Sequence, residues 1–319
     1  MSSEKIQPPR RRFALRFSLR SLLIAITLLC IGLSWWMYRA RRQSAAVKGI
    51  RDSGGWVYYD YQRYDAKKSK SDFAADSPIP KMLIDGLGVD FFHNVDVVSM
   101  VYAYEDGGKT RRDNPNASAN ISPLLSGFPY LRYLAVKEHQ LDDAGFAELA
   151  KLKGLEEFFF WDADQITDKG VTQLRNMPRL RTVHLSGTHL SDLGLATLAG
   201  LPCIDTLSLQ QNEVSDEGVK ALRDNPTIEV LWLGSTGNHR SQISDASIPV
   251  FASMPKLRVL ELQRTQVTVK GLRPLQGHAM LSELYLGVSR AIDKDAAKAV
   301  LPKVKVSVIG SGNGYRRLC

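Results

Sequence analysis

Residues 180–202 read LRTVHLSGTHLSDLGLATLAGLP, and this stretch shows the pattern that decides the fold. It opens with apolar residues at positions i, i+3 and i+5, which are Leu180, Val183 and Leu185. The last two are two residues apart and therefore share one face of a strand. A Ser-Asp pair then predicts a helix start, because such side chains accept hydrogen bonds from the free amide groups there. Pro202 cannot continue a helix and marks its end.

The same unit recurs eight times, at steps of 24, 25, 24, 24, 29, 24 and 23 residues, and the last unit supplies only a closing strand. The units start at Leu131, Leu155, Leu180, Ile204, Ile228, Leu257, Leu281 and Val304. One unit cannot bury its own apolar face, so the units must stack into an array with a continuous core. The period is that of leucine-rich repeats. We therefore predict an α/β fold, a leucine-rich-repeat solenoid: a curved right-handed superhelix with a parallel β-sheet on its concave side and short helices on its convex side.

An irregular ninth unit is expected ahead of the array. Val95, Val98 and Met100 keep the i, i+3, i+5 spacing, and residues 105–120 would then form a polar insertion. Terminal repeats are commonly atypical because they cap the core. We therefore place the repeat domain at residues 80–319.

The amino-terminal part of the chain differs in composition from the repeat domain. Residues 21–38 contain no charge, span roughly the thickness of a bilayer as a helix, and end in an aromatic cluster suited to the membrane interface. We predict a basic tail at 1–20, a transmembrane helix at 21–38 and a juxtamembrane or capping segment at 39–79. A cleaved signal peptide is the alternative, although only residues 44–46 resemble a cleavage motif.

The charge distribution bears on orientation and on partners. Residues 1–51 hold eleven Lys and Arg residues against one acidic residue, a net charge of +10, so residues 52–319 carry −1 of the total of +9. The basic residues are therefore interpreted as topology signals and contacts to anionic lipid, and no nucleic-acid partner is expected. Six positive residues precede the span and five follow it, which slightly favours a cytoplasmic amino terminus. We expect a single-pass membrane protein whose repeat domain lies outside the cytoplasm.

Several segments together resemble a known protein family. They are RFSLRSLLIAITLLCIGLSWWMYRARRQ (16–43), IRDSGGWVYYDYQ (50–62), LGVDFFHNVDVVSMV (87–101) and units of the form LxxLxLxxTxLSDxGLxxLxxLP. This combination is similar to the membrane-anchored leucine-rich-repeat proteins of planctomycete bacteria. The repeats resemble the cysteine-containing, ribonuclease-inhibitor-like subtype, although Cys203 is the only cysteine in the array. The resemblance implies a fold and a membrane topology, and it carries no assigned activity.

The sequence offers little for catalysis. It contains no P-loop, GxSxG or HExxH string, and its three cysteines make neither a disulfide framework nor a zinc site. Cys203 is expected to be a small core residue. His184 falls in a strand and His189 in the following turn, so their side chains should point to different surfaces. We predict no catalytic residue, metal or cofactor, and a non-enzymatic protein.

The strands of the array offer a surface for binding. Side chains at i+2, i+4 and i+6 should face away from the core and line the concave side. Large aromatic groups in a partly polar surround are typical of a binding patch. The alternatives are that a loop or the aromatic segment 56–61 folds over them, or that they are scattered and inert. The candidate residues on this face are Lys137, Phe159, Trp161, His184, Gln210, Trp232, Glu261, Gln263 and Tyr285.

The 29-residue unit offers a second candidate site. It inserts five residues around 237–241, on one rim of the solenoid, where His239 and Arg240 could contact a partner. Insertions in loops are also often neutral. The prediction is a membrane-anchored protein that binds another protein or an envelope polymer through its concave face. The alternative is a structural component of the cell envelope without a discrete ligand.

Overall fold

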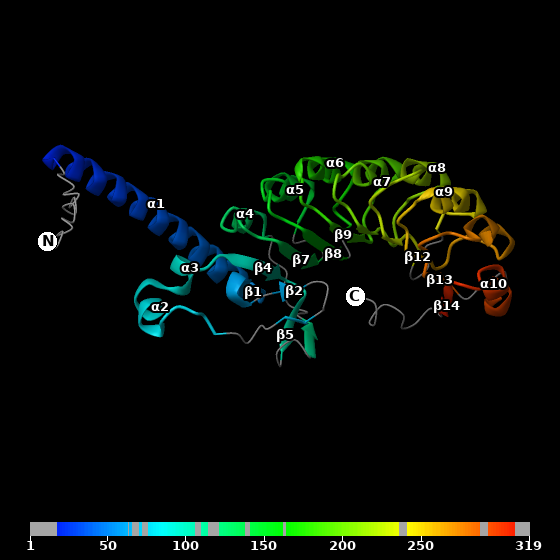
Figure 1. Ribbon diagram of the computed structural model, residues 1–319, viewed down its shortest axis with the longest axis horizontal. Helices are drawn as coiled ribbons and strands as arrows, with labels where there is room; N and C mark the ends of the chain where they lie inside the picture. Colours follow the sequence, from blue (N-terminus) through cyan, green and yellow to red (C-terminus); the bar gives the residue numbers. More distant parts are fainter. Residues whose placement is uncertain are drawn as a thin grey trace, which may run out of the picture.

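The protein is a curved array with helices along its convex side and strands along its concave side (Figure 1). The computed structural model describes residues 18–62, 64–65, 70–71, 76–105, 110–113, 121–137, 141–161, 164–235, 241–287 and 293–309.

A single ten-stranded sheet runs through the array in the order β1-β4-β7-β8-β9-β10-β11-β12-β13-β14. All neighbours from β4 onward are parallel, and β1 pairs antiparallel with β4 at the edge. The register aligns equivalent positions of successive units, as in Phe158, Val183 and Leu207. The strands are β1 (Trp56–Tyr59), β4 (Val95–Ser99), β7 (Tyr133–Lys137), β8 (Glu157–Trp161), β9 (Thr182–Ser186), β10 (Thr206–Ser208), β11 (Val230–Trp232), β12 (Val259–Leu262), β13 (Glu283–Gly287) and β14 (Lys305–Ile309).

Short helices return the chain from each strand to the next. The apolar residues of the repeat frame, such as Leu180, Val183 and Leu195, are fully buried in one continuous core. The predicted leucine-rich-repeat solenoid is therefore confirmed. The convex helices are α4 (Ser122–Leu125), α5 (Asp143–Leu149), α6 (Asp168–Val171), α7 (Asp192–Ala199), α8 (Asp216–Val219), α9 (Ile248–Ser253) and α10 (Lys294–Val300), with 3-10 turns η3 (Thr172–Asn176), η4 (Lys220–Leu222), η5 (Asp245–Ser247) and η6 (Lys270–Leu275).

The Ser/Thr-Asp pairs do more than cap helices. Ser215 accepts the N–H of Glu217 at 3.2 Å, as expected of a cap. Asp192 reaches across to the next unit. There its carboxylate accepts one hydrogen bond from the backbone N–H of Ser215 at 2.8 Å and another from the Ser215 hydroxyl at 2.7 Å. Each such aspartate therefore ties its own unit to the following one. The same pairing joins Asp143 to Thr167, Asp168 to Ser191, Asp216 to Ser244, and Asp245 to Thr268.

In four of the five ties a glycine of the next unit lies against the aspartate, and in the fifth the Ser247 hydroxyl donates to Asp216. A Cβ atom on Gly218 would lie 2.2 Å from Oδ1 of Asp192, closer than atoms can approach. Glycine at this position therefore lets the aspartate reach the turn that it caps.

The helix α1 (Leu19–Asp52) is longer than the predicted span. It continues past residue 38 to Asp52, and the chain turns at Gly54, which has a φ of 77°. Beyond the apolar segment, one face of α1 becomes buried, and Ala46, Val47 and Ile50 belong to the same core as the repeats. In Figure 1, α1 projects from the end of the array where β1 and β4 lie.

The remaining elements surround this end of the array. Here α3 (Val89–Phe92) lies beside α1, α2 (Lys81–Leu87) packs on α3, and η1 (Asp60–Gln62) follows β1. Two small antiparallel sheets pair β2 (Tyr64–Asp65) with β3 (Lys70–Ser71), and β5 (Tyr102–Glu105) with β6 (Thr110–Asp113). The second of these pairs lies in the region expected to be a polar insertion.

The expectation for Cys203 is wrong. Its side chain is exposed, because it sits in the turn after Pro202, one position before the core residue Ile204.

Candidate binding face on the concave sheet

The concave face is built from three columns of side chains, one from each outward-facing strand position. Within each strand, odd and even residues point to opposite faces, and the parallel register stacks equivalent residues side by side. The predicted residues Phe159, His184 and Trp232 come from one such column. Phe159 and Trp232 are partly exposed, whereas His184 is buried.

Aromatic rings form a continuous surface over the first half of this face. Phe159 stacks on Trp161 with ring centroids 5.6 Å apart, and Trp161 lies 5.2 Å from His184. His184 in turn meets Trp232 edge-on at 6.3 Å. The structure thus brings together four residues that the repeat pattern predicted separately. We call Tyr58, Tyr133, Phe159, Trp161, His184 and Trp232 the concave aromatic cluster.

Two members of this cluster were missed in the sequence. Tyr133 packs on Phe159 with ring centroids 5.1 Å apart and occupies the i+2 position of its repeat. Tyr58 lies on β1, next to Val97 in register, and packs in the same apolar group as Tyr133. The aromatic segment around Tyr58 therefore extends the sheet at its edge, a placement that the repeat period does not encode.

Two polar atoms on the concave side have no hydrogen-bond partner within the described part of the chain. They are Oγ of Ser208 and Nε1 of Trp232, which sit side by side in the register of β10 and β11. Buried polar groups are normally paired. Both atoms are buried and therefore lie beneath the surface of the concave face.

A buried carboxylate lies in the second half of the face. Glu261 is 3% exposed and accepts hydrogen bonds from Nε2 of Gln210 at 3.1 Å, the Gly234 N–H at 2.9 Å and the Gln263 N–H at 2.8 Å. Burial raises the pKa of Glu261 to about 7, and the three hydrogen bonds lower it in part. Near neutral pH this carboxyl group therefore exchanges readily between its neutral and ionised forms.

Burial has the opposite effect on the histidine of the cluster. It lowers the pKa of His184 to about 4, so the ring is neutral at physiological pH. It contacts its neighbours as an uncharged aromatic ring. His189 is exposed in the following turn, as expected from its position.

The other predicted residues flank these two groups. Lys137 ends β7 and lies beside Trp161 in register, and Tyr285 lies beside Glu261. The Tyr285 hydroxyl donates to the carboxylate of Glu283. His239 and Arg240 fall outside the described residues.

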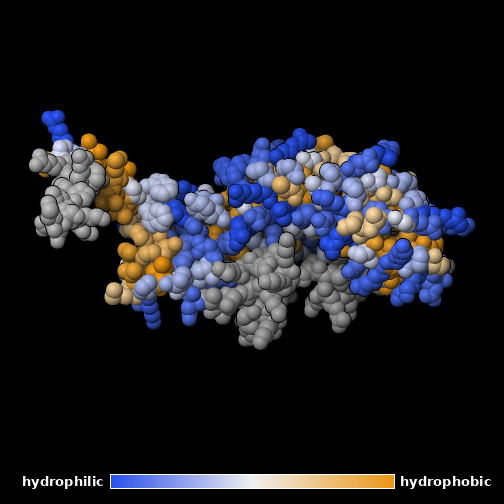
Figure 2. All heavy atoms as spheres, viewed as in Figure 1, coloured by the Kyte–Doolittle hydropathy of each residue, from blue (hydrophilic) through white to orange (hydrophobic). Residues whose placement is uncertain are grey.

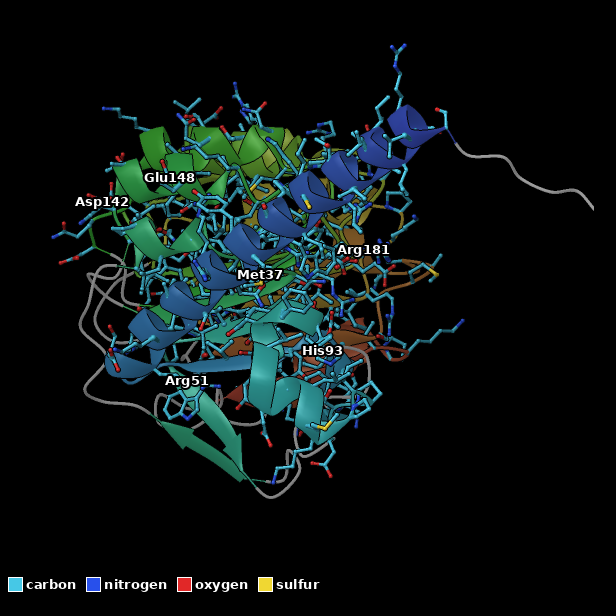
Figure 3. All side chains as sticks on the ribbon, turned by 90° about the vertical axis from the view of Figure 1, so that its left-hand side faces the viewer. Met37, Arg51, His93, Asp142, Glu148 and Arg181 are labelled. Atoms are coloured by element: carbon cyan, nitrogen blue, oxygen red, sulfur yellow. The ribbon has the colours of Figure 1, made fainter. Side chains whose placement is uncertain are left out.

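We call the end of α1, together with β1, η1, α2 and α3, the cap. A separate cluster of polar side chains lies in the cap, where Figure 3 labels His93. Nε2 of His93 is 2.8 Å from the Ser77 hydroxyl, and Nδ1 is 2.9 Å from the Asp60 carboxylate. This order of contacts is that of a hydrolase triad. However, the Ser77 hydroxyl accepts the Ile79 N–H, and Asp60 accepts the backbone N–H of Asn94. We assign these contacts to holding the chain before α2 against the end of β1.

The described residues contain no group of three or more His, Cys, Asp or Glu side chains that could hold a metal ion. The concave face offers the partly exposed rings of Phe159, Trp161 and Trp232, with one buried carboxyl group, Glu261, further along the sheet.

Comparison with known proteins gives one family match and a similar solved structure. A family model described as leucine-rich repeat matches residues 177–199 and 200–222. Among solved structures, an internalin from Listeria monocytogenes is similar with a TM-score of 0.43 and 23% sequence identity, over 60% of this chain and 57% of the internalin chain. The chain thus spans little more than half of that protein's length. No curated protein sequence matches it.

The fold and the matched repeats define the class: this chain is a leucine-rich-repeat solenoid. Repeats of this class generally mediate protein–protein interactions and are typically non-enzymatic binding scaffolds.

Proposed function

We propose that this chain is a single-span, membrane-anchored, non-enzymatic protein that binds a protein partner through its concave face. The observation that carries the proposal is the concave aromatic cluster, whose rings touch one another from β7 to β11. Aromatic side chains dominate interface energetics because they bury large areas at a low entropic cost.

The anchor in this proposal is residues 21–38. Among the described residues, α1 is a helix long and apolar enough to cross a membrane. No residue of its most apolar stretch is buried against the rest of the protein. Arg20 and Arg39 bound the uncharged stretch, and Trp35 and Trp36 lie at its distal end. We place the basic tail in the cytoplasm and the repeat domain outside it, in agreement with the slight excess of positive charge before the span.

The proposal also includes the protein family to which this chain is related. The segments 16–43, 50–62 and 87–101 support a protein of the planctomycete membrane-anchored type, and the repeat consensus supports the ribonuclease-inhibitor-like subtype. A contact at the rim insertion, through His239 and Arg240, is a secondary element of the proposed interface.

Binding is tested by removing the aromatic surface. The full chain with Phe159, Trp161 and Trp232 all replaced by Ala is purified in mild detergent beside the wild type. We expect the partner that co-purifies with the wild type to be lost, because the replaced rings supply most of the contact area. Leu193→Ala is the matched control, since Leu193 is exposed on the convex helix α7.

Circular dichroism and thermal unfolding of each variant show whether the fold is retained. If the triple variant is folded and keeps the same partner, the concave face is not the binding surface. If the wild type recovers only copies of itself, a structural envelope component is the better description.

Orientation is tested with reporter fusions after Cys319. A reporter that works only outside the cytoplasm is expected to be active there. Activity of a reporter that works only in the cytoplasm would reverse the proposed topology, and release of the chain from membranes by alkaline carbonate would contradict the anchor.

A further inference from the structure

An apolar groove lies between α1 and α3, close to the end of the proposed span. It has a volume of about 590 Å³. Leu28, Leu29, Gly32 and Leu33 line it from α1, and Phe91 and Phe92 line it from α3.

The α3 wall of the groove is held firmly against α1. The indole N–H of Trp36 donates to the Phe91 carbonyl at 2.6 Å, and the two rings meet edge-on at 6.2 Å. Deeper in the cap, Nε2 of the buried Gln43 donates to the Asp90 carboxylate at 3.0 Å and to the His93 carbonyl at 2.8 Å. The groove is therefore a built feature of the fold.

The position of the groove along α1 indicates what fills it. Gly32 lies six residues before Tyr38, about 9 Å into the span at the rise of an α-helix. If residues 21–38 cross the bilayer, this wall faces acyl chains, and so do the phenyl rings opposite. In water an open apolar surface of this kind would be unfavourable.

The apolar surface continues onto α2. Met82, Leu83 and Leu87 are 79%, 41% and 49% exposed, which is unusual for a helix of seven residues on a water-soluble face. In Figure 2 the orange surface of α1 is followed by a second orange area over α2 and α3. An exposed apolar face beside a membrane span is suited to contact with the bilayer interface.

Cationic groups complete the site at its interfacial end. The guanidinium of Arg39 sits over the Trp36 ring at 5.0 Å and over the Tyr130 ring at 4.8 Å, and Arg42 lies one turn further along α1. Stacked arginines beside an apolar groove match a phospholipid, which combines acyl chains with an anionic phosphate.

We propose that the groove between α1 and α3 seats an acyl chain of a membrane phospholipid, so that α2 and α3 form a second contact of this protein with the bilayer. This inference rests on the proposed single span. A second contact of this kind fixes the tilt of the array over the membrane, because α3 is joined to the cap by the Gln43 hydrogen bonds.

The test is photolabelling of the full chain in vesicles of phosphatidylcholine and phosphatidylglycerol. The phosphatidylcholine carries a diazirine in the middle of one acyl chain, and labelled peptides are identified by mass spectrometry. We expect label on residues 28–33 and also on residues 88–92. Label on α1 with none on residues 88–92 would overturn the groove while leaving the anchor intact. No label on α1 would overturn both.

A substitution in the groove sharpens the result. Gly32→Leu fills the groove from the α1 side, and no atom lies within 4 Å of the position that a Cβ would take. We expect loss of label from residues 88–92, with label on α1 retained. Ile31→Phe is the matched control, since Ile31 is exposed on the same turn and does not line the groove. Equal loss in both variants, or unchanged label on residues 88–92 in Gly32→Leu, would contradict the proposal.

Discussion

Glu261 sits in the concave sheet with only neutral hydrogen-bond donors around its carboxylate: the Gln210 amide and two backbone N–H groups. Its pKa is raised from an ordinary value of 4.5 to about 7 by burial. Below pH 4.5 the group is protonated in the folded and unfolded chains alike and has no effect. Between pH 4.5 and 7 only the unfolded chain ionises, so the stability of the fold falls as the pH rises.

We therefore predict that Glu261→Gln removes the loss of folding stability that the wild type shows as the pH rises. The pKa shift from 4.5 to about 7 corresponds to about 3 kcal/mol of unfolding free energy. The unfolding free energy of the variant, relative to wild type, should rise between these pH values and stay level above them. Denaturant unfolding of the full chain in detergent at several pH values measures this. Glu213→Gln is the control, because Glu213 is exposed, and parallel curves for wild type and Glu261→Gln would contradict the assignment.

The repeat pattern predicted which residues face the concave side but not how buried they are. Periodicity fixes the direction of a side chain such as His184 or Glu261, whereas burial depends on how closely neighbouring strands bring their side chains together. The Gln210 amide that bonds to Glu261 lies 51 residues away, in the turn after β10, a strand that is not a neighbour of β12. No local pattern in the sequence encodes that contact.

At the scale of elements, five aspartates tie the convex turn of one repeat to that of the next. We call them the aspartate ladder: Asp143, Asp168, Asp192, Asp216 and Asp245. We predict that Asp192→Ala destabilises the fold by about 1–3 kcal/mol, because it leaves the Ser215 N–H and hydroxyl without their acceptor. The neighbouring Glu217→Ala should cost about 1 kcal/mol or less, since its ion pair with Lys220 is exposed. Urea unfolding distinguishes the two, and equal losses would show that the ladder adds nothing beyond surface charge.

Gly218 gives an independent test of the same contact. Gly218→Ala should destabilise wild type, because the new methyl group collides with the Asp192 carboxylate. The same substitution should cost less in a chain that already carries Asp192→Ala. A double-mutant cycle measures this coupling, and strictly additive effects would show that Asp192 does not occupy this position.

The caps of the convex helices were predictable, and the ladder was not. Ser191 and Ser215 precede helix starts in the sequence, so their local role follows from their position. The partner of each aspartate lies one repeat away. The available signal was the glycine two residues after three of the four Ser/Thr-Asp pairs, at Gly170, Gly194 and Gly218. Its meaning becomes clear only when the units are stacked.

The helix α1 joins the anchor to the array without a flexible linker. We predict that a chain beginning at residue 39 folds stably, whereas one beginning at residue 53 does not, because Ile50 and Val47 belong to the core. Ile50→Ala alone should cost about 2–5 kcal/mol. Equal unfolding midpoints for the two truncated chains would show that α1 contributes nothing to the cap.

At the scale of the whole molecule, the solenoid, its parallel sheet and the apolar helix before it were all readable from the sequence. The repeat identifies the array because each unit needs its neighbours to bury its core. The continuity of α1 into the cap and the side-by-side placement of α1 and α3 were not readable. They depend on contacts between residues such as Gln43 and His93 that lie far apart in the chain.

The most direct test of concave recognition places a photo-crosslinking amino acid at Trp161 of the full chain in its native membranes, with the same group at Leu193 on the convex side as reference. The account predicts a crosslinked protein of constant mass at position 161, absent at position 193, and lost when Phe159 is also replaced by Ala. The same crosslinks at both positions, or none at position 161, would contradict concave-face recognition.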